Sequence, residues 1–173
     1  SMPDMIALLK QLKASSGQKE QEIFRCMIHN LFDEYRFFHK YPEKELQVTG
    51  QLFGCLIFHS LVSNITLGIA LRYVLEALRK EPDRGGEKMF RFGKIALEQF
   101  KSRLSEWPQY CSHLVQIPHL AKHCPELFAE AQKAISAPQS SANSDSTSGL
   151  IDDMDKLNMG PQLDSPGMSP QLS

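Results

Sequence analysis

Apolar residues recur at every third or fourth position from about residue 3 to residue 135. This spacing places them on one face of an α-helix, so it predicts a series of amphipathic helices that share a core. No segment of this region shows the clear alternation of apolar and polar residues that is typical of a half-buried strand. The sequence therefore predicts an all-α fold.

Turn residues and prolines divide this region into about seven helices. We predict these helices near residues 6–12, 18–38, 43–60, 64–80, 87–106, 108–118 and 125–135. Helices of this length joined by short loops are typical of an antiparallel helical-hairpin stack of the HEAT-like kind, here without a fixed repeat period. In the third helix, Gly50 and Gly54 permit the close approach of a neighbouring helix.

Three segments are expected from this pattern. Residues 1–17 hold a residue left by tag cleavage and a short leading helix, and residues 18–135 form the HEAT-like helical-repeat domain. Residues 136–173 contain nine Ser, four Pro and no aromatic residue, so we expect a disordered tail. That tail is either a solvated linker or the carrier of a short docking motif, because Leu150, Ile151, Met154 and Leu157 have the spacing of one helical face.

Charge argues against a dedicated nucleic-acid binder. The tail carries five Asp against one Lys, a net charge of -4, which leaves +3 for residues 1–135 out of the total of -1. Such a surplus is too small for the strong basic patch that nucleic-acid binding needs. An RNA-binding alternative stays open on basic residues that could cluster near two loops: Lys40, Lys44, Arg79, Lys80, Arg84, Lys101 and Arg103.

The four cysteines are far apart in the sequence and form no CxxC pair, and no secretory leader precedes them. We therefore expect reduced thiols in an intracellular, soluble protein. The densest group of metal-ligating residue types is Cys111, His113, His119, His123 and Cys124. No second pair completes a zinc pattern, so we interpret this group as ordinary helix-end and surface residues and expect no metal.

No motif of nucleophilic catalysis, phosphate binding or metalloprotease chemistry stands in the chain. We expect neither an enzyme nor a cofactor site. Large apolar residues are instead abundant on the second and fifth predicted helices, and core packing accounts for most of them. A surplus that includes Phe37, Phe38 and Tyr41 exceeds what one core face uses, and such a surplus is typical of a groove for a partner helix.

Five stretches resemble the large NOT scaffold subunit of the CCR-NOT deadenylase complex, in the domain that docks tristetraprolin. They are NLFDEYRFF (30–38), YPEKEL (41–46), LFG (52–54), LGIALRYVLEALRK (67–80) and WPQYC (107–111). The likeness covers about residues 18–120. It implies a helical-repeat fold, similar to the middle domain of translation-initiation scaffolds, without catalysis of its own.

In that family the domain binds short helical peptides of mRNA-binding repressors, and other subunits shorten the poly(A) tail. Together with the apolar stripe, the resemblance implies peptide-binding roles for Phe24, Met27, Ile28, Leu31, Tyr35 and Phe90. It also implies contacts with other CCR-NOT subunits through the rest of the scaffold, and a cytoplasmic location in processing bodies with a nuclear pool. We expect a monomer that binds neither nucleic acid nor membrane. The main alternative is a rigid adaptor for a folded nuclease or helicase subunit.

Overall fold

The computed structural model describes residues 1–136, and these residues fold into eight α-helices and three 3-10 segments without a strand. The predicted tail and its apolar motif lie outside the described residues. The helices are α1 (Met2–Ala14), α2 (Gln18–Glu34), α3 (Glu43–Phe58), α4 (Asn64–Arg79), α5 (Glu87–Phe100), α6 (Pro108–Val115), α7 (Leu120–His123) and α8 (Pro125–Ser136). The 3-10 segments are η1 (Tyr35–Lys40), η2 (Pro82–Arg84) and η3 (Lys101–Glu106).

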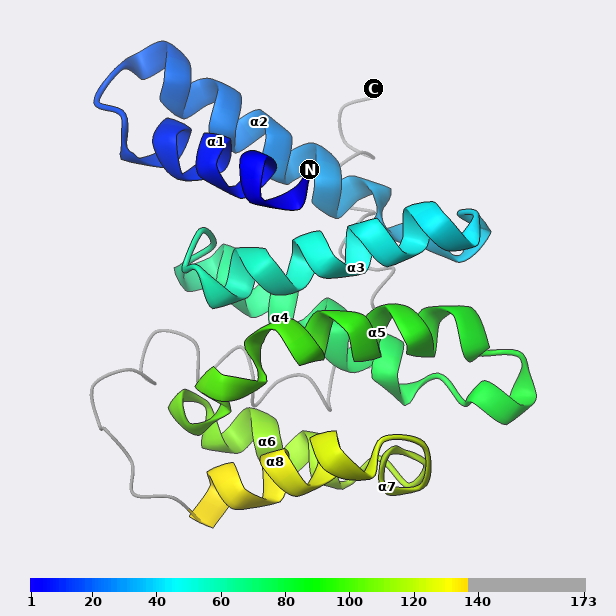
Figure 1. Cartoon of the computed structure of the whole chain (residues 1–173). Helices are drawn as coiled ribbons and strands as arrows, with labels where there is room; N and C mark the ends of the chain where they lie inside the picture. The colour runs from blue at the N-terminus through cyan, green and yellow to red at the C-terminus, as the bar shows by residue number, and fades with distance from the viewer. Residues whose placement is uncertain (137–173) are drawn as a thin grey trace, which may run out of the picture.

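The helices stack in antiparallel hairpins, which confirms the predicted fold class. In Figure 1, α1 and α2 form the top of the stack, α3 and α4 lie below them, and α6 and α8 form the bottom. The α5 helix packs against both α3 and α4, and α8 packs against α6, α7 and η3. Each layer thus covers the apolar face of the next, as a helical stack requires.

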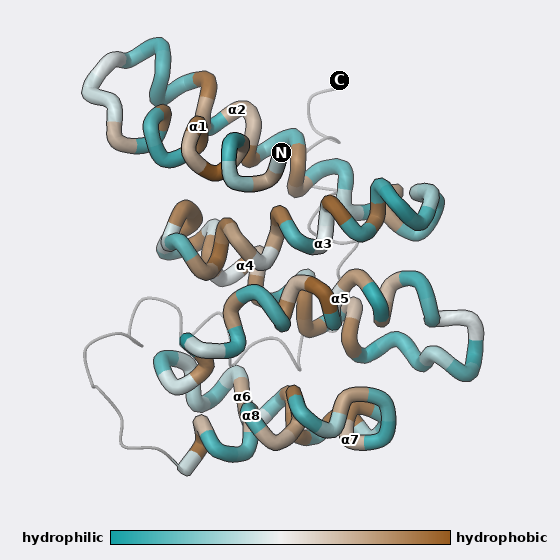
Figure 2. The backbone as a smooth tube through the Cα atoms, viewed as in Figure 1, coloured by the Kyte–Doolittle hydropathy of each residue, from teal (hydrophilic) through white to brown (hydrophobic). Residues whose placement is uncertain are grey.

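The distribution of hydrophobic residues along the chain agrees with this stack of helices. Figure 2 shows hydrophobic and hydrophilic stretches alternating along the helices, while the connection between α4 and α5 is largely hydrophilic. Within residues 1–136, no helix combines the length and the apolar content needed to cross a bilayer.

Two predicted helices end earlier than the sequence pattern indicated. The second was expected to reach Phe38 and the fifth Glu106, but α2 ends at Glu34 and α5 at Phe100, and a 3-10 segment continues each of them. A 3-10 segment keeps helical hydrogen bonding but tightens the turn, so the side-chain pattern continues while the register changes. The short α7 raises the number of α-helices to eight, one more than predicted.

The leading helix belongs to the same core as the rest. Ile6 and Leu9 of α1 are 6% and 2% exposed and join the hydrophobic cluster that runs through the stack. The α1 helix packs against both α2 and α3. It therefore caps one end of the stack.

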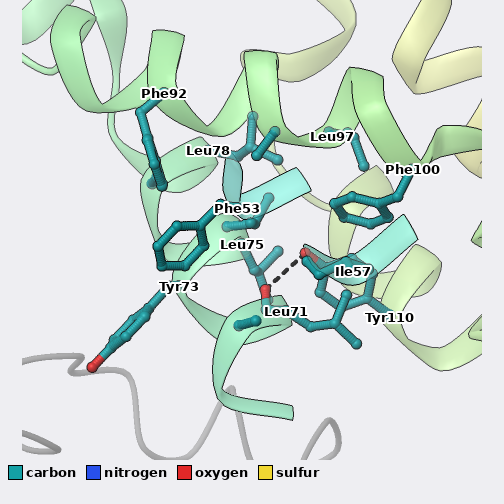
Figure 3. Packing of buried hydrophobic residues seen from close by; sticks show 14 of the residues in the cluster. Phe53, Ile57, Leu71, Tyr73, Leu75, Leu78, Phe92, Leu97, Phe100 and Tyr110 are labelled. Carbon is teal, nitrogen blue, oxygen red and sulfur yellow. Dashed lines mark hydrogen bonds between the residues drawn. The ribbon is translucent and has the colours of Figure 1, made fainter. Parts of the chain in front are cut away.

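Aromatic rings fill the centre of the N-terminal half. Phe38, Phe53 and Phe92 are completely buried, and the Phe53 and Phe92 ring centroids lie 5.2 Å apart. Tyr35 stacks on Tyr73 with ring centroids 4.0 Å apart. Figure 3 shows Phe53 of α3 and Phe92 of α5 turned toward each other among the leucines of α4. Such ring pairs stabilise a core beyond the area that they bury.

The hydroxyl groups of two buried tyrosines donate hydrogen bonds to backbone carbonyl oxygens of α4. The Tyr110 hydroxyl donates to the carbonyl oxygen of Leu71 at 2.8 Å, the contact drawn in Figure 3, and the Tyr35 hydroxyl donates to that of Tyr73 at 3.2 Å. A buried hydroxyl without a partner would destabilise the fold. These two bonds therefore tie α6 and the start of η1 to α4.

The predicted close approach at the glycines of α3 is confirmed, and its partner is α5. A Cβ atom at Gly54 would fall 2.6 Å from the Gln99 side chain and closer still to the carbonyl oxygen of Ala96. A Cβ atom at Gly50 would lie 3.1 Å from Ile95 Cγ2. The carbonyl oxygen of Phe92 lies 3.2 Å from the same Cβ position at Gly50, so both glycines face α5 backbone, but the approach is much closer at Gly54.

We predict that Gly54→Ala lowers the free energy of unfolding by about 1–3 kcal/mol, because the added methyl group forces α3 and α5 apart. The gain of about 1 kcal/mol in helix propensity does not offset this clash. Urea denaturation of both glycine variants measures the effect, and Gly50→Ala should cost less. A Gly54→Ala protein as stable as the wild type would contradict the close approach.

A second prediction separates a core aromatic from a surface one. Tyr35→Ala should lower the free energy of unfolding by about 3–5 kcal/mol, because it leaves a cavity beside Tyr73. Phe37→Ala is the matched control, since the Phe37 side chain is 41% exposed and lies under the Arg36 guanidinium. Thermal or urea unfolding would show a large loss for Tyr35→Ala alone, and equal losses would refute the assignment of Tyr35 to the core.

Candidate peptide-binding cleft

A cleft of about 370 Å³ lies between α2 and the start of α4, and we call it the α2–α4 cleft. Its apolar lining consists of Phe24, Ile28, Phe32, Leu61 and Ile69. Ile28, Phe32 and Leu61 are buried, whereas Phe24 and Ile69 are only partly covered. The cleft therefore offers an apolar floor that the protein itself leaves incompletely covered.

The remaining lining residues are polar and form the rim of the cleft: Lys13, Gln21, Arg25, His29, Ser63 and Thr66. No carboxylate is among these lining residues. Arg25 pairs with Glu22 at 2.9 Å and His29 approaches Asp33 at 3.5 Å, but all four side chains are more than half exposed. Exposed pairs of this kind contribute little to stability, so the rim can exchange them for a partner's carboxylates.

The tight connection from α3 to α4 forms one wall of the cleft. Ser60 and Asn64 adopt left-handed backbone conformations, with φ of 56° and 52°. Such residues change the chain direction sharply, and Asn tolerates this conformation better than most. The Ser63 amide then donates to Thr66 Oγ1 at 3.1 Å, which fixes the first turn of α4.

Arg103 of η3 holds this connection in place. Its Nη1 donates to the carbonyl oxygens of Ile57 at 2.7 Å and Phe58 at 3.0 Å, and to Ser60 Oγ at 3.0 Å. Its Nε and Nη2 donate to the two carboxylate oxygens of Glu106 at 2.8 and 2.7 Å. A guanidinium is suited to such a set of bonds because its donors form a fixed planar fork. Arg103, one of the basic residues that left RNA binding open, thus has a structural role.

Four of the six predicted peptide-binding residues lie on α2, and two of these line the cleft. Phe24 and Ile28 face it, one helical turn apart. Met27 and Leu31 are partly buried against the core and are not among the lining residues. The edge of the apolar stripe, rather than its whole width, therefore contributes to the cleft.

Tyr35 and Phe90 are buried at other places in the stack. Tyr35 is 8% exposed within the aromatic core, and Phe90 is 6% exposed at the start of α5. The Phe90 ring lies 5.4 Å from His119 and 5.7 Å from His123, measured between centroids. The structure thus does not gather the six residues into one surface, and their binding roles stay predictions. Sequence reasoning missed Leu61, Ser63, Thr66 and Ile69, which reach the cleft from another hairpin.

The three aromatic residues that exceed the needs of one core face, Phe37, Phe38 and Tyr41, lie in different environments. Phe38 is fully buried, so it belongs to the core and not to a groove. The Tyr41 hydroxyl donates to Glu34 Oε1 at 2.9 Å. Burial, and then this bond to a carboxylate, raise the pKa of Tyr41 to about 12. Phe37 alone of the three stays largely exposed.

Four of the five residues in the histidine and cysteine group near the C-terminus are buried, which corrects their interpretation as surface residues. The fifth, His123, is partly exposed and lies 3.4 Å from an Asp83 carboxylate oxygen. Among residues 1–136, no three His, Cys, Asp or Glu side chains come together as a metal-binding group. The ring Nε2 of His119 lies 2.7 Å from the carbonyl oxygen of Leu78, at the end of α4. The Cys111 thiol donates to the carbonyl oxygen of Leu104 at 3.4 Å, and burial raises its pKa to about 12. Such a thiol stays protonated, and the four buried members of the group pack in the core.

Sequence relatives of this chain include a fission yeast protein and a nematode protein. A fission yeast protein (Schizosaccharomyces pombe), "General negative regulator of transcription subunit 1", is 39% identical over 79% of this chain. A Caenorhabditis elegans protein, "CCR4-NOT transcription complex subunit let-711", is 35% identical over 75% of it. The chain spans only 6% and 5% of the length of these relatives.

The fold points to the same group of proteins. The solved structure described as "N-Terminal domain of the yeast Not1" matches with a TM-score of 0.71 and 32% sequence identity, over 78% of this chain and 25% of that one. A family model described as "CCR4-NOT transcription complex subunit 1 TTP binding domain" matches residues 1–143. The match includes the leading helix and the cleft. The chain therefore belongs to the family of TTP-binding domains of CCR4-NOT transcription complex subunit 1.

Proposed function

We propose that this chain is a non-catalytic docking module that binds short helical peptides of tristetraprolin-like mRNA-binding repressors in the α2–α4 cleft. The observation that carries the proposal is the cleft itself, with an apolar floor and a rim that bears Lys13, Arg25 and His29 without a lining carboxylate. An amphipathic helix binds such a groove through apolar residues at three- and four-residue spacing. The family of the chain supports this choice of partner.

The proposed role is recruitment. A repressor that is bound to its mRNA would be held by this domain, and through the rest of the scaffold it would be joined to the subunits that shorten the poly(A) tail. The transcript is then deadenylated and its translation is repressed. This role places the protein in the cytoplasm, including processing bodies, with a nuclear pool, and it requires no direct contact between this domain and RNA.

The cleft should concentrate its binding energy on few side chains, because buried anchors dominate helix-in-groove interfaces. Phe24 is the best candidate on the protein side, since its ring is partly exposed and lies 5.6 Å from the Lys13 ammonium. Removing this ring should leave the fold intact, because Phe24 is outside the completely buried core.

We therefore predict that Phe24→Ala weakens binding of a tristetraprolin-like helical peptide about tenfold, a loss of about 1.4 kcal/mol. Val48→Ala is the control, because Val48 is an apolar residue of α3 that is 51% exposed and does not line the cleft. Calorimetric titration gives both affinities, and the unfolding midpoint verifies that each variant is folded.

Equal weakening by both variants would place the peptide elsewhere. Unchanged affinity for Phe24→Ala, with the peptide still bound, would also contradict the assignment. A binding footprint much larger than one helix would favour the adaptor for a folded subunit, since folded partners cover broader and more polar surfaces.

A further inference from the structure

We propose that the segment 150–157 of this same chain occupies the α2–α4 cleft and competes there with external peptides. The inference rests on the proposed function in one respect, namely that the cleft accepts a helical peptide. It adds a segment of the chain itself as a ligand of that site, so the cleft would be unoccupied in only a fraction of the molecules.

The segment has the residue pattern of helices that bind apolar grooves. Its sequence is LIDDMDKL, with apolar residues at positions 150, 151, 154 and 157. This spacing of i, i+1, i+4 and i+7 places them on one face of a helix. The apolar floor formed by Phe24, Ile28 and Ile69 is a matching surface.

Charge complements the apolar match. Asp152, Asp153 and Asp155 interleave with the apolar positions, and the segment carries one Lys. The rim of the cleft presents Lys13 and Arg25, together with His29, and no lining carboxylate. Complementary charge of this kind favours one orientation and raises the rate of encounter.

The connection is long enough to reach the cleft. The structure ends at Ser136, and thirteen residues, 137–149, precede the segment. At about 3.3–3.6 Å per residue they span at most roughly 45 Å. Figure 1 shows the end of α8 on the same side of the stack as the start of α2, with the α3/α4 and α5 layers between them. Three steps between layers, from α8 to α5, from α5 to the α3/α4 layer and from there to α2, amount to roughly 24–30 Å at 8–10 Å each.

A tethered ligand competes strongly even when its intrinsic affinity is low. A linker that can span the gap gives an effective concentration in the millimolar range, according to general estimates for short linkers. An external peptide must displace this occupant, so its apparent affinity falls. An external peptide would thus need a higher affinity or a higher concentration to occupy the cleft than it would without the segment.

The test uses the full chain with Leu150→Asp and Met154→Asp together. The matched control is Leu163→Asp with Met168→Asp, which makes the same two changes outside the segment. We expect the segment variant to bind a tristetraprolin-like helical peptide at least about threefold more tightly than the wild type, with the control unchanged. Identical affinities of all three proteins would overturn the inference and leave the proposed function standing.

A second arm does not depend on the external partner. A synthetic peptide of residues 147–160 is titrated into the chain that carries Leu150→Asp and Met154→Asp. Binding that Phe24→Ala removes and Val48→Ala preserves would support the inference, even where the repressor-like peptide fails to bind and the proposed function falls. No binding, or binding that Phe24→Ala leaves intact, would overturn it. Dimers of the wild-type chain in light scattering, absent from the segment variant, would overturn the intramolecular form.

Discussion

The close approach of α3 and α5 at Gly54 is the constraint on which the rest of the structure depends. Without a side chain at this position, the α3 backbone rests against the carbonyl of Ala96, and the aromatic rings of the two helices interlock. Phe53 and Phe92 then form the centre to which η1 adds Tyr35 and Phe38. A larger spacing at Gly54 would leave these rings without their contacts, and close packing makes such a gap costly.

The packing of this core also determines which residues of α2 line the α2–α4 cleft. Met27 and Leu31 of the apolar stripe on α2 pack against the core, and Phe32 packs on the rings of Phe53 and Tyr73. The cleft is therefore lined by one edge of the stripe, which carries Phe24 and Ile28 and ends at Phe32. The α1 helix packs on both α2 and α3 and so holds α2 against the stack. Arg103 fixes the opposite wall by capping the end of α3. The shape of the cleft therefore depends on how the α1/α2 and α3/α4 hairpins are held relative to each other.

Periodicity alone predicts much of this fold. The all-α class, the order of hairpins and the role of Gly54 follow from residue spacing, because helical spacing and small residues act locally. The same reasoning identifies the stripe on α2 but does not separate Tyr35 from Phe24, since both fit the stripe and only tertiary contacts cover one of them. Leu61 and Ile69 could not be predicted as cleft residues, because their approach to α2 depends on the left-handed turns at Ser60 and Asn64.

We propose that this domain binds its helical peptide in the α2–α4 cleft. Methyl NMR spectra recorded while a tristetraprolin-like helical peptide is titrated into the full chain test it most directly. We expect large shifts for the methyl groups of Ile28, Leu61 and Ile69, and small ones for the exposed Val48 and Ile135 outside the cleft. Shifts centred on Val48 or Ile135, with Ile28 and Ile69 unaffected, would contradict it.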